Sequence, residues 1–310
     1  MKLNLPKGWA SGFLVEGDEH AFAGPASQVE DILSELELHD VTAPALRKYT
    51  ADMVALGWLS DDATEDVDLQ AQTIVTLLHG FPQSSPALLR GSLDVVEVKK
   101  IKDPRLTAWL AYLNWLSTRE KYDSLYTLGS VNVETIREIA KLSVHEDGPV
   151  RAIKHLRRLG VSMHVTRAIP GTRVDGCAFW CLTNRPLIGL SLRYDRLDNF
   201  WFSLLHECAH VALHVTGPDQ AFADDFSVRD NLEDVEVEAN LAAADAAIPR
   251  AMWKRSEAAK WPTAANIERI AQEAGVHPCI AAGRVRYEKV DYTLLGKLIG
   301  QGQVAKLFGL

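Results

Sequence analysis

The first half of the chain carries its apolar residues at helical spacing. Positions three and four apart share one face of an α-helix, so this spacing predicts amphipathic helices. Gly and Pro separate the segments, notably at residues 80–82 and 148–149, as expected of turns. We therefore expect a helical N-terminal region over residues 1–148. Its predicted helices span residues 29–38, 45–59, 69–79, 106–122 and 133–142.

The pattern changes after residue 160, where apolar and polar residues begin to alternate. The alternation over residues 161–165 is typical of a half-buried strand. Residues 176–182 and 187–192 are two further predicted strands, joined by a turn at 183–186. The sequence therefore predicts a small antiparallel sheet.

A long helix follows the predicted sheet, over residues 199–214. Asp198 is its expected N-cap, since an Asp side chain at that position accepts a hydrogen bond from a backbone N–H of the first turn. Helical spacing returns from residue 235 to the C-terminus. The fold class we expect is α+β and mostly helical, with a second domain over residues 149–310.

Composition and charge narrow the class of protein. The 310 residues are enough for about two domains. The chain has 33 Lys and Arg against 41 Asp and Glu, a net charge of −8, which disfavours a globally basic nucleic-acid binder. No apolar stretch approaches the roughly 18 residues that span a bilayer, and residues 1–6 lack the apolar region of a signal peptide. We expect a cytoplasmic protein with no membrane partner.

The predicted long helix contains the most informative motif, His206-Glu207-x-x-His210. A helix turns about 100° per residue, so the two histidines lie one turn apart on one face. Two imidazoles at this spacing can bind one zinc ion. The alternative is a solvated helix that carries two histidines by chance.

Glu207 lies beside the ligand face and is the expected catalytic residue. Zinc lowers the pKa of a bound water to about 7 and polarises a peptide carbonyl. At this position Glu207 can accept the proton of that water and carry it to the leaving amine, which is the role of a general base.

A third metal ligand is expected on the next helix, since a catalytic zinc takes three protein ligands and leaves the fourth position open. Glu236 and Glu238 are about 200° apart on a helix, so only one of them can face the metal. We favour Glu236, which lies on the same side as Asn240. Glu238 is the second choice and Glu233 the third.

Three other side chains have open interpretations. His214, one turn beyond His210, either supports the site as a hydrogen-bonding partner or is a satisfied, partly buried histidine. Cys177 and Cys181 share one face of a predicted strand. If that face meets the cleft over the zinc site, one thiolate could occupy the open zinc position and regulate the site. The alternative is that both thiols are simply packed in the core.

The residues around the motif carry a resemblance to a known family over about residues 150–290. Supporting stretches are a lead-in at residues 190–193 and 198–202 and a tail at 280–285. The two matching motifs are His206-Glu207-x-x-His210-x-x-x-His214 and Glu236-x-x-x-Asn240-x-x-Ala243-x-x-x-x-Ile248-Pro249.

With these motifs the chain resembles the ImmA/IrrE metallopeptidases, in particular the peptidase part of HigA-like antitoxin and regulator fusions. The resemblance implies a zincin-like peptidase domain over residues 149–310, with a small antiparallel sheet and an HExxH helix. It implies that His206, His210 and Glu236 bind Zn²⁺ and that Glu207 is the catalytic glutamate.

The resemblance also implies a biological role. Members of the family cleave a helix-turn-helix repressor protein, which derepresses stress-response, mobile-element or phage-defence genes. The longer relatives begin with a helix-turn-helix domain, whereas residues 1–45 here show none and are acidic, which suits DNA poorly. We therefore expect cleavage of a separate repressor in trans, with DNA as a candidate activating signal.

Two other classes of function remain as alternatives. One is a non-enzymatic regulator or antitoxin that retains the peptidase fold. The other is a structural zinc protein, whose metal site would have four protein ligands, preferably including Cys. The presence of His206, Glu207, His210 and Glu236 together favours the enzyme. The sequence sets no oligomeric state.

Overall fold

A computed structural model describes residues 43–56, 58, 104–122, 124–181, 183–217, 221–224 and 234–310. The chain has two compact units: Met1–Arg119 with Ile169–Thr172, and Glu120–Ala168 with Arg173–Leu310. The helices expected at 29–38 and 69–79 lie outside the described residues.

The first unit contains two described helices, α2 (Ala43–Ala55) and α4 (Pro104–Arg119), which correspond to the helices expected at 45–59 and 106–122. The two helices contact each other. Trp58 stacks on Tyr112 with ring centroids 5.1 Å apart. Burial raises the pKa of Tyr112 to about 12, so its phenol stays neutral.

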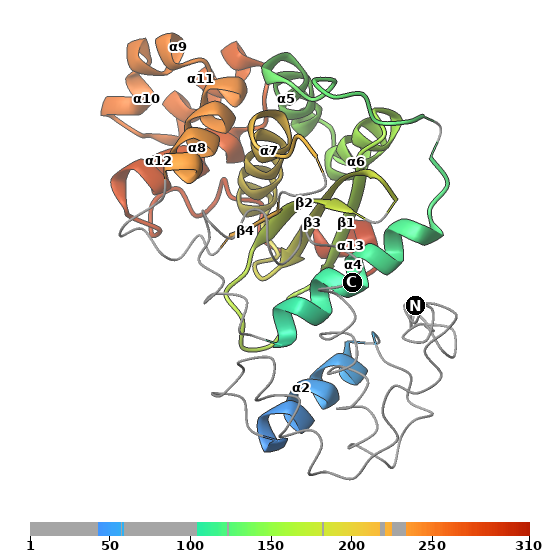
Figure 1. The fold of residues 1–310 in the computed structure, drawn as a ribbon. Coiled ribbons are helices and arrows are strands. Elements are labelled where there is room, and N and C mark those ends of the chain that lie inside the picture. The colour runs from blue at the N-terminus through green and yellow to red at the C-terminus, as the bar shows by residue number, and fades with distance from the viewer. Residues whose placement is uncertain are drawn as a thin grey trace, which may run out of the picture. The chain divides into compact units, whose positions relative to one another are not determined.

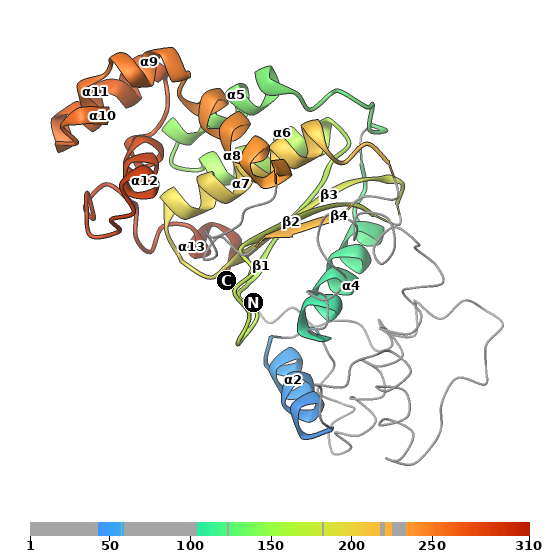
Figure 2. The ribbon, with the colours of Figure 1, turned by 60° about the vertical axis from the view of Figure 1, so that its left-hand side comes forward.

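The second unit is built on a four-stranded sheet in the order β1-β3-β2-β4 (Figures 1 and 2). Its strands are β1 (Ser162–Arg167), β2 (Gly176–Cys181), β3 (Arg185–Leu192) and β4 (Ala221–Asp224). The β2–β3 hairpin turns at Asn184, which has φ 58°, a conformation that Asn adopts more readily than most residues.

The sheet is mixed, which corrects the expected antiparallel arrangement. β2 runs antiparallel to β3 and β4, but β1 pairs in parallel with β3. The alternation of apolar residues identifies strands but not their neighbours. Because β3 lies between β1 and β2, the strand that precedes the hairpin pairs with its second strand rather than its first.

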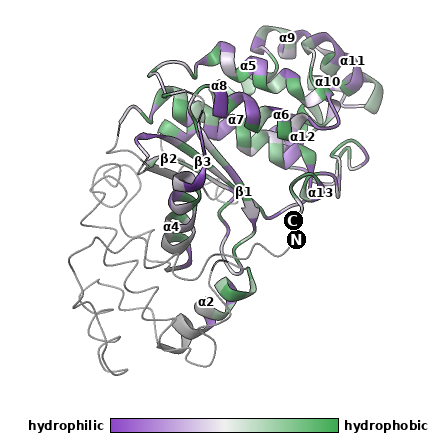
Figure 3. Cartoon of the chain, turned by 90° about the vertical axis from the view of Figure 1, so that its right-hand side faces the viewer, coloured by the Kyte–Doolittle hydropathy of each residue, from purple (hydrophilic) through white to green (hydrophobic). Residues whose placement is uncertain are grey.

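Helices cover the sheet face on which the core of this unit lies, as Figure 2 shows for α5 to α8. In Figure 3 both hydrophobic (green) and hydrophilic (purple) residues occur along α5 and α11, as in amphipathic helices. Among the described residues, no helix combines the length and apolar character that a membrane crossing requires. The helices are α5 (Val133–Lys141), the 3₁₀ helix η6 (Leu142–Val144), α6 (Gly148–Arg158), α7 (Leu197–Leu213), α8 (Asp234–Ala247), α9 (Arg250–Arg255), α10 (Glu257–Lys260), α11 (Ala264–Ala274), α12 (Pro278–Lys289) and α13 (Ala305–Phe308).

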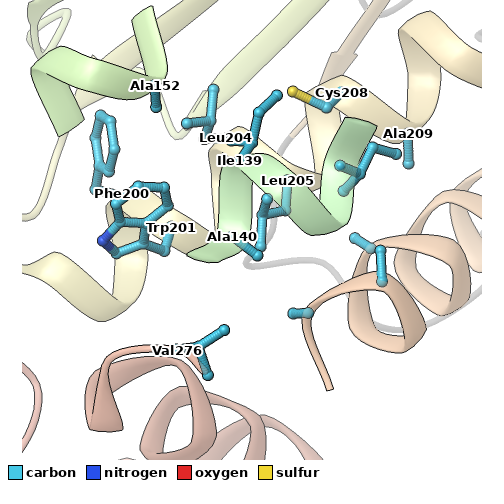
Figure 4. Packing of buried hydrophobic residues seen from close by; sticks show 14 of the residues in the cluster. Ile139, Ala140, Ala152, Phe200, Trp201, Leu204, Leu205, Cys208, Ala209 and Val276 are labelled. Atoms are coloured by element: carbon cyan, nitrogen blue, oxygen red, sulfur yellow. The ribbon is translucent and has the colours of Figure 1, made fainter. Parts of the chain in front are cut away.

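The central helix is α7, which contacts α5, α8, α12, β2 and β3. The mostly helical α+β class expected from the sequence is thus confirmed. Helix α5, expected in the N-terminal region, instead belongs to this unit because it packs on α7 and α8. Figure 4 shows side chains of α5 and α7 meeting in the core, with Ile139 close to Leu204 and Leu205.

The start of α7 differs from expectation. The helix begins at Leu197 and its N-cap is Arg196, whereas Asp198 lies in the first turn. Both carboxylate oxygens of Asp198 accept hydrogen bonds from the Arg196 guanidinium, at 2.8 and 2.9 Å. The same carboxylate accepts a hydrogen bond from the Asn199 N–H at 2.9 Å. An acidic side chain here favours the positive end of the helix dipole.

A buried polar cluster adjoins β1. Nε2 of His164 lies 3.0 Å from Oγ of Ser162 and 3.7 Å from a Glu120 oxygen, and Glu120 also pairs with Arg157. His164 is 7% exposed. Burial, followed by the charge of Arg157, lowers the pKa of His164 to about 3. The imidazole is therefore neutral in the folded protein at pH 7.

This histidine predicts a pH dependence of stability. Between about pH 6.5, its unfolded pKa, and pH 3, the unfolded chain binds a proton that the folded chain does not. Folding stability is therefore complete above this window and falls as pH falls through it, by at most about 1.4 kcal/mol per pH unit. His164→Gln should flatten the pH profile of the free energy of unfolding, measured by urea denaturation from pH 7 to 4. Identical slopes in the two proteins would contradict the assignment.

Candidate metal centre

Two helices bring together three side chains that could hold a metal ion. His206 and His210 lie on α7 with their Nε2 atoms 2.9 Å apart. Glu236, in the first turn of α8, places Oε2 3.3 Å from Nε2 of His206 and Oε1 3.3 Å from Nε2 of His210. Both histidines are fully buried and the Glu236 side chain is 16% exposed. The close packing of α7 on α8 produces this convergence.

The geometry of the three side chains fits a divalent ion. Ligands about 2.1 Å from a tetrahedral zinc lie about 3.4 Å from one another, close to the spacing found here. One ligand atom from each of His206, His210 and Glu236 lies within 4.8 Å of the other two. Among the described residues, this is the only group of three or more His, Cys, Asp or Glu side chains placed to hold a metal ion. Two imidazoles and one carboxylate form a donor set suited to zinc with an open fourth position.

Glu236 is ionised in this arrangement. Burial alone would raise its pKa, but hydrogen bonds and charge from His206 and His210 hold the pKa well below its usual range. The carboxylate therefore stands ready to bind a cation without first losing a proton.

Glu207 is fully buried and lies against the first residue of β2. A Cβ placed on Gly176 would come within 2.1 Å of Glu207 Oε1 and 2.9 Å of its carboxyl carbon. The absence of a side chain at residue 176 thus makes room for the carboxylate between α7 and the sheet. This close approach was not apparent from the sequence, where Gly176 marks only the start of a predicted strand.

Each histidine of the pair has a partner at its second ring nitrogen. Nδ1 of His206 lies 3.1 Å from Oδ1 of Asn240, and Nδ1 of His210 lies 3.0 Å from Nδ1 of His214. Partners at Nδ1 orient the ring and direct Nε2 to the metal. His214 therefore supports the site as a hydrogen-bonding partner, which is the first of its two interpretations. Asn240 has the same position behind His206.

The other two candidate glutamates lie elsewhere. Glu238, the second choice for the third ligand, points to His214, with 3.3 Å between Oε2 and Nε2. Glu233 lies outside the described residues. The helical argument that only one of Glu236 and Glu238 faces the histidine pair agrees with this geometry.

The cysteine hypothesis is wrong. Cys177 and Cys181 share a face of β2, but residues at even positions of this strand face α7: Gly176 approaches Glu207 and Ala178 belongs to the core beneath the helix. Alternation along the strand therefore turns the two thiols to the opposite face, where both are buried. Both thiols therefore lie on the face of β2 that is turned away from Glu207 and α7.

The fold and the site together are those of a peptidase-like domain with a candidate metal centre. Residues 157–286 match the family model of peptidase family M78, described as the IrrE N-terminal-like domain. The matched range contains α7 and α8 and covers most of the second unit. The chain therefore contains an ImmA/IrrE-family domain, and this metallopeptidase family implies a metal. Searches of curated proteins and of solved structures found no match.

The contact between Gly176 and Glu207 can be tested by a double-mutant cycle. Gly176→Ala should lower the free energy of unfolding by about 1 to 3 kcal/mol, because the new methyl group overlaps the Glu207 carboxylate. The same substitution in a Glu207→Ala background should cost at least about 1 kcal/mol less, since the colliding atoms are gone. Denaturant unfolding of the four proteins measures the coupling; additive effects would contradict the contact.

Proposed function

We propose that this protein is a zinc-dependent endopeptidase that cleaves a helix-turn-helix transcriptional repressor in trans. The observation that carries the proposal is the convergence of His206, His210 and Glu236, with the buried Glu207 beside them. The match to a metallopeptidase family supports the same reaction class.

His206, His210 and Glu236 would hold the zinc ion. When bound, the ion supplies Lewis acidity, which polarises a peptide carbonyl and acidifies water. Three protein donors leave one coordination position open, as catalysis requires and as a structural site of four protein ligands does not.

Glu207 would serve as the general base. Because it follows His206 on α7, its carboxylate is set beside the ligand face rather than on it. It accepts a proton from the attacking water at one carboxylate oxygen and delivers it to the nitrogen of the leaving amine. Its position is fixed by the packing against Gly176, so little reorganisation is needed during the reaction.

The substrate proposal rests on the family resemblance of the motifs. Their relatives cleave one helix-turn-helix repressor, so cleavage in the cytoplasm would derepress stress-response, mobile-element or phage-defence genes. The net charge of −8 favours a protein substrate over direct operator binding by this chain. DNA enters the proposal as an activating signal.

Metal binding should depend on three side chains but not on the base. His210→Ala and Glu236→Ala should lose zinc at equimolar metal, whereas Glu207→Gln should retain one zinc per chain, because Glu207 is not a ligand. Atomic absorption after gel filtration measures the content. Glu268→Gln, an exposed charge change on α11, is the control. Full zinc content in Glu236→Ala would remove it from the ligand set.

Cleavage should depend on Glu207. Zinc-loaded wild-type protein, incubated with candidate helix-turn-helix repressors from the same genome, should cut one of them at one site, and Glu207→Gln should leave it intact. Parallel reactions with and without single-stranded DNA test the activating signal. Cleavage by Glu207→Gln would show that the assigned base is wrong. Tight binding of the repressor by the zinc-loaded wild type without any cleavage would favour the non-enzymatic regulator.

A further inference from the structure

We propose that His214 and Glu238 are positioning residues for the metal site: they form a hydrogen-bonded relay that fixes the tautomer and orientation of His210. The proposal rests on the zinc site of the proposed function and adds two residues to it. The relay runs from the metal-facing edge of His210, through His214, to a carboxylate at the surface.

The relay is continuous in the structure. Nδ1 of His210 lies 3.0 Å from Nδ1 of His214, and Nε2 of His214 lies 3.3 Å from Oε2 of Glu238. The two imidazole rings are tilted by 54° with centroids 5.0 Å apart. His214 is the C-cap of α7, and its backbone N–H donates to the His210 carbonyl at 2.8 Å. The end of the helix therefore holds His214 directly behind His210.

Metal binding through Nε2 of His210 allows one arrangement of protons along this relay. Nε2 offers its lone pair to the ion, so the ring proton of His210 is on Nδ1, from which it is donated to Nδ1 of His214. His214 then carries its own proton on Nε2 and donates it to Glu238. A neutral imidazole has one donor and one acceptor nitrogen, so each step determines the next.

The two ligand histidines are supported differently. His206 has the neutral amide oxygen of Asn240 as its partner, whereas the relay behind His210 ends in a carboxylate. Exposure increases along the relay, from 0% at His210 to 9% at His214 and 62% at Glu238. A carboxylate acting through an imidazole increases the basicity of the metal-bound ring, and loss of such partners typically weakens metal binding roughly 10- to 100-fold.

A matched pair of substitutions isolates the acceptor at His214. In His214→Asn the amide oxygen takes the place of Nδ1 and can accept from His210, whereas His214→Leu has the same size and no acceptor. We expect zinc affinity, measured by competition with a chromophoric chelator, to fall roughly 10- to 100-fold in His214→Leu and to remain within a few-fold of wild type in His214→Asn. The melting temperatures of the two metal-free variants should agree, which excludes a general loss of structure.

Glu238 provides a second test with little risk to folding, because its side chain is 62% exposed. Glu238→Leu should weaken zinc binding while the metal-free protein melts as the wild type does. Glu268→Leu, at an exposed position on α11, is the control and should bind zinc normally. Long-range ¹H–¹⁵N spectra of the zinc-loaded protein should show the His214 proton on Nε2.

The outcomes separate the relay from the proposed function. Zinc affinity of His214→Leu within twofold of wild type, equal weakening in His214→Asn and His214→Leu, or a His214 proton on Nδ1 would each overturn the relay while the zinc site stands. Failure of the wild-type protein to bind zinc would overturn both. Normal zinc binding with no peptide cleavage would overturn the proposed function alone.

Discussion

The packing of α7 against α8 brings a carboxylate to two imidazole nitrogens: the nitrogens lie 2.9 Å apart, and each lies 3.3 Å from one oxygen of Glu236. Neither helix alone supplies all three side chains. α7 supplies two imidazoles one turn apart, and α8 brings a carboxylate to their open side. The sheet, α5 and α12 contact α7 and so support its position.

The packing of α7 on α8 and the sheet buries polar side chains on a face of α7 that would ordinarily be apolar. His206, Glu207 and His210 are fully buried, and a buried polar group is costly unless it is paired. For the two histidines the structure meets this requirement with Asn240 and His214 at the second ring nitrogens, while the missing side chain at Gly176 leaves room for the Glu207 carboxylate. Partners at the second nitrogen of a ligand histidine fix the orientation of its ring and so direct the first nitrogen to the metal.

Some features of this arrangement could be read from local sequence. The spacing of His206 and His210 sets them on one helical face, and the same periodicity separates Glu236 from Glu238 on α8. Three of the four strands, β1, β2 and β3, and the main helices of the second unit were also visible as apolar patterns, whereas β4 was not predicted. Strand pairing was not, because alternation is identical for parallel and antiparallel neighbours. The cap of α7 was misplaced by two residues, since an acidic residue is favourable both at the N-cap and within the first turn.

Cys177, Cys181 and Gly176 show where local reasoning ends. Period-two geometry correctly placed the two cysteines on one face of β2, but which face meets α7 depends on how the helix packs on the sheet. The sequence by itself determined the helix, the pair of imidazoles on one face and the chemistry of the carboxylate beside them, because these follow from the 3.6-residue period. Only the tertiary structure decided which glutamate meets them, where Glu207 rests and what stands behind His210, because these depend on contacts between elements distant in the chain.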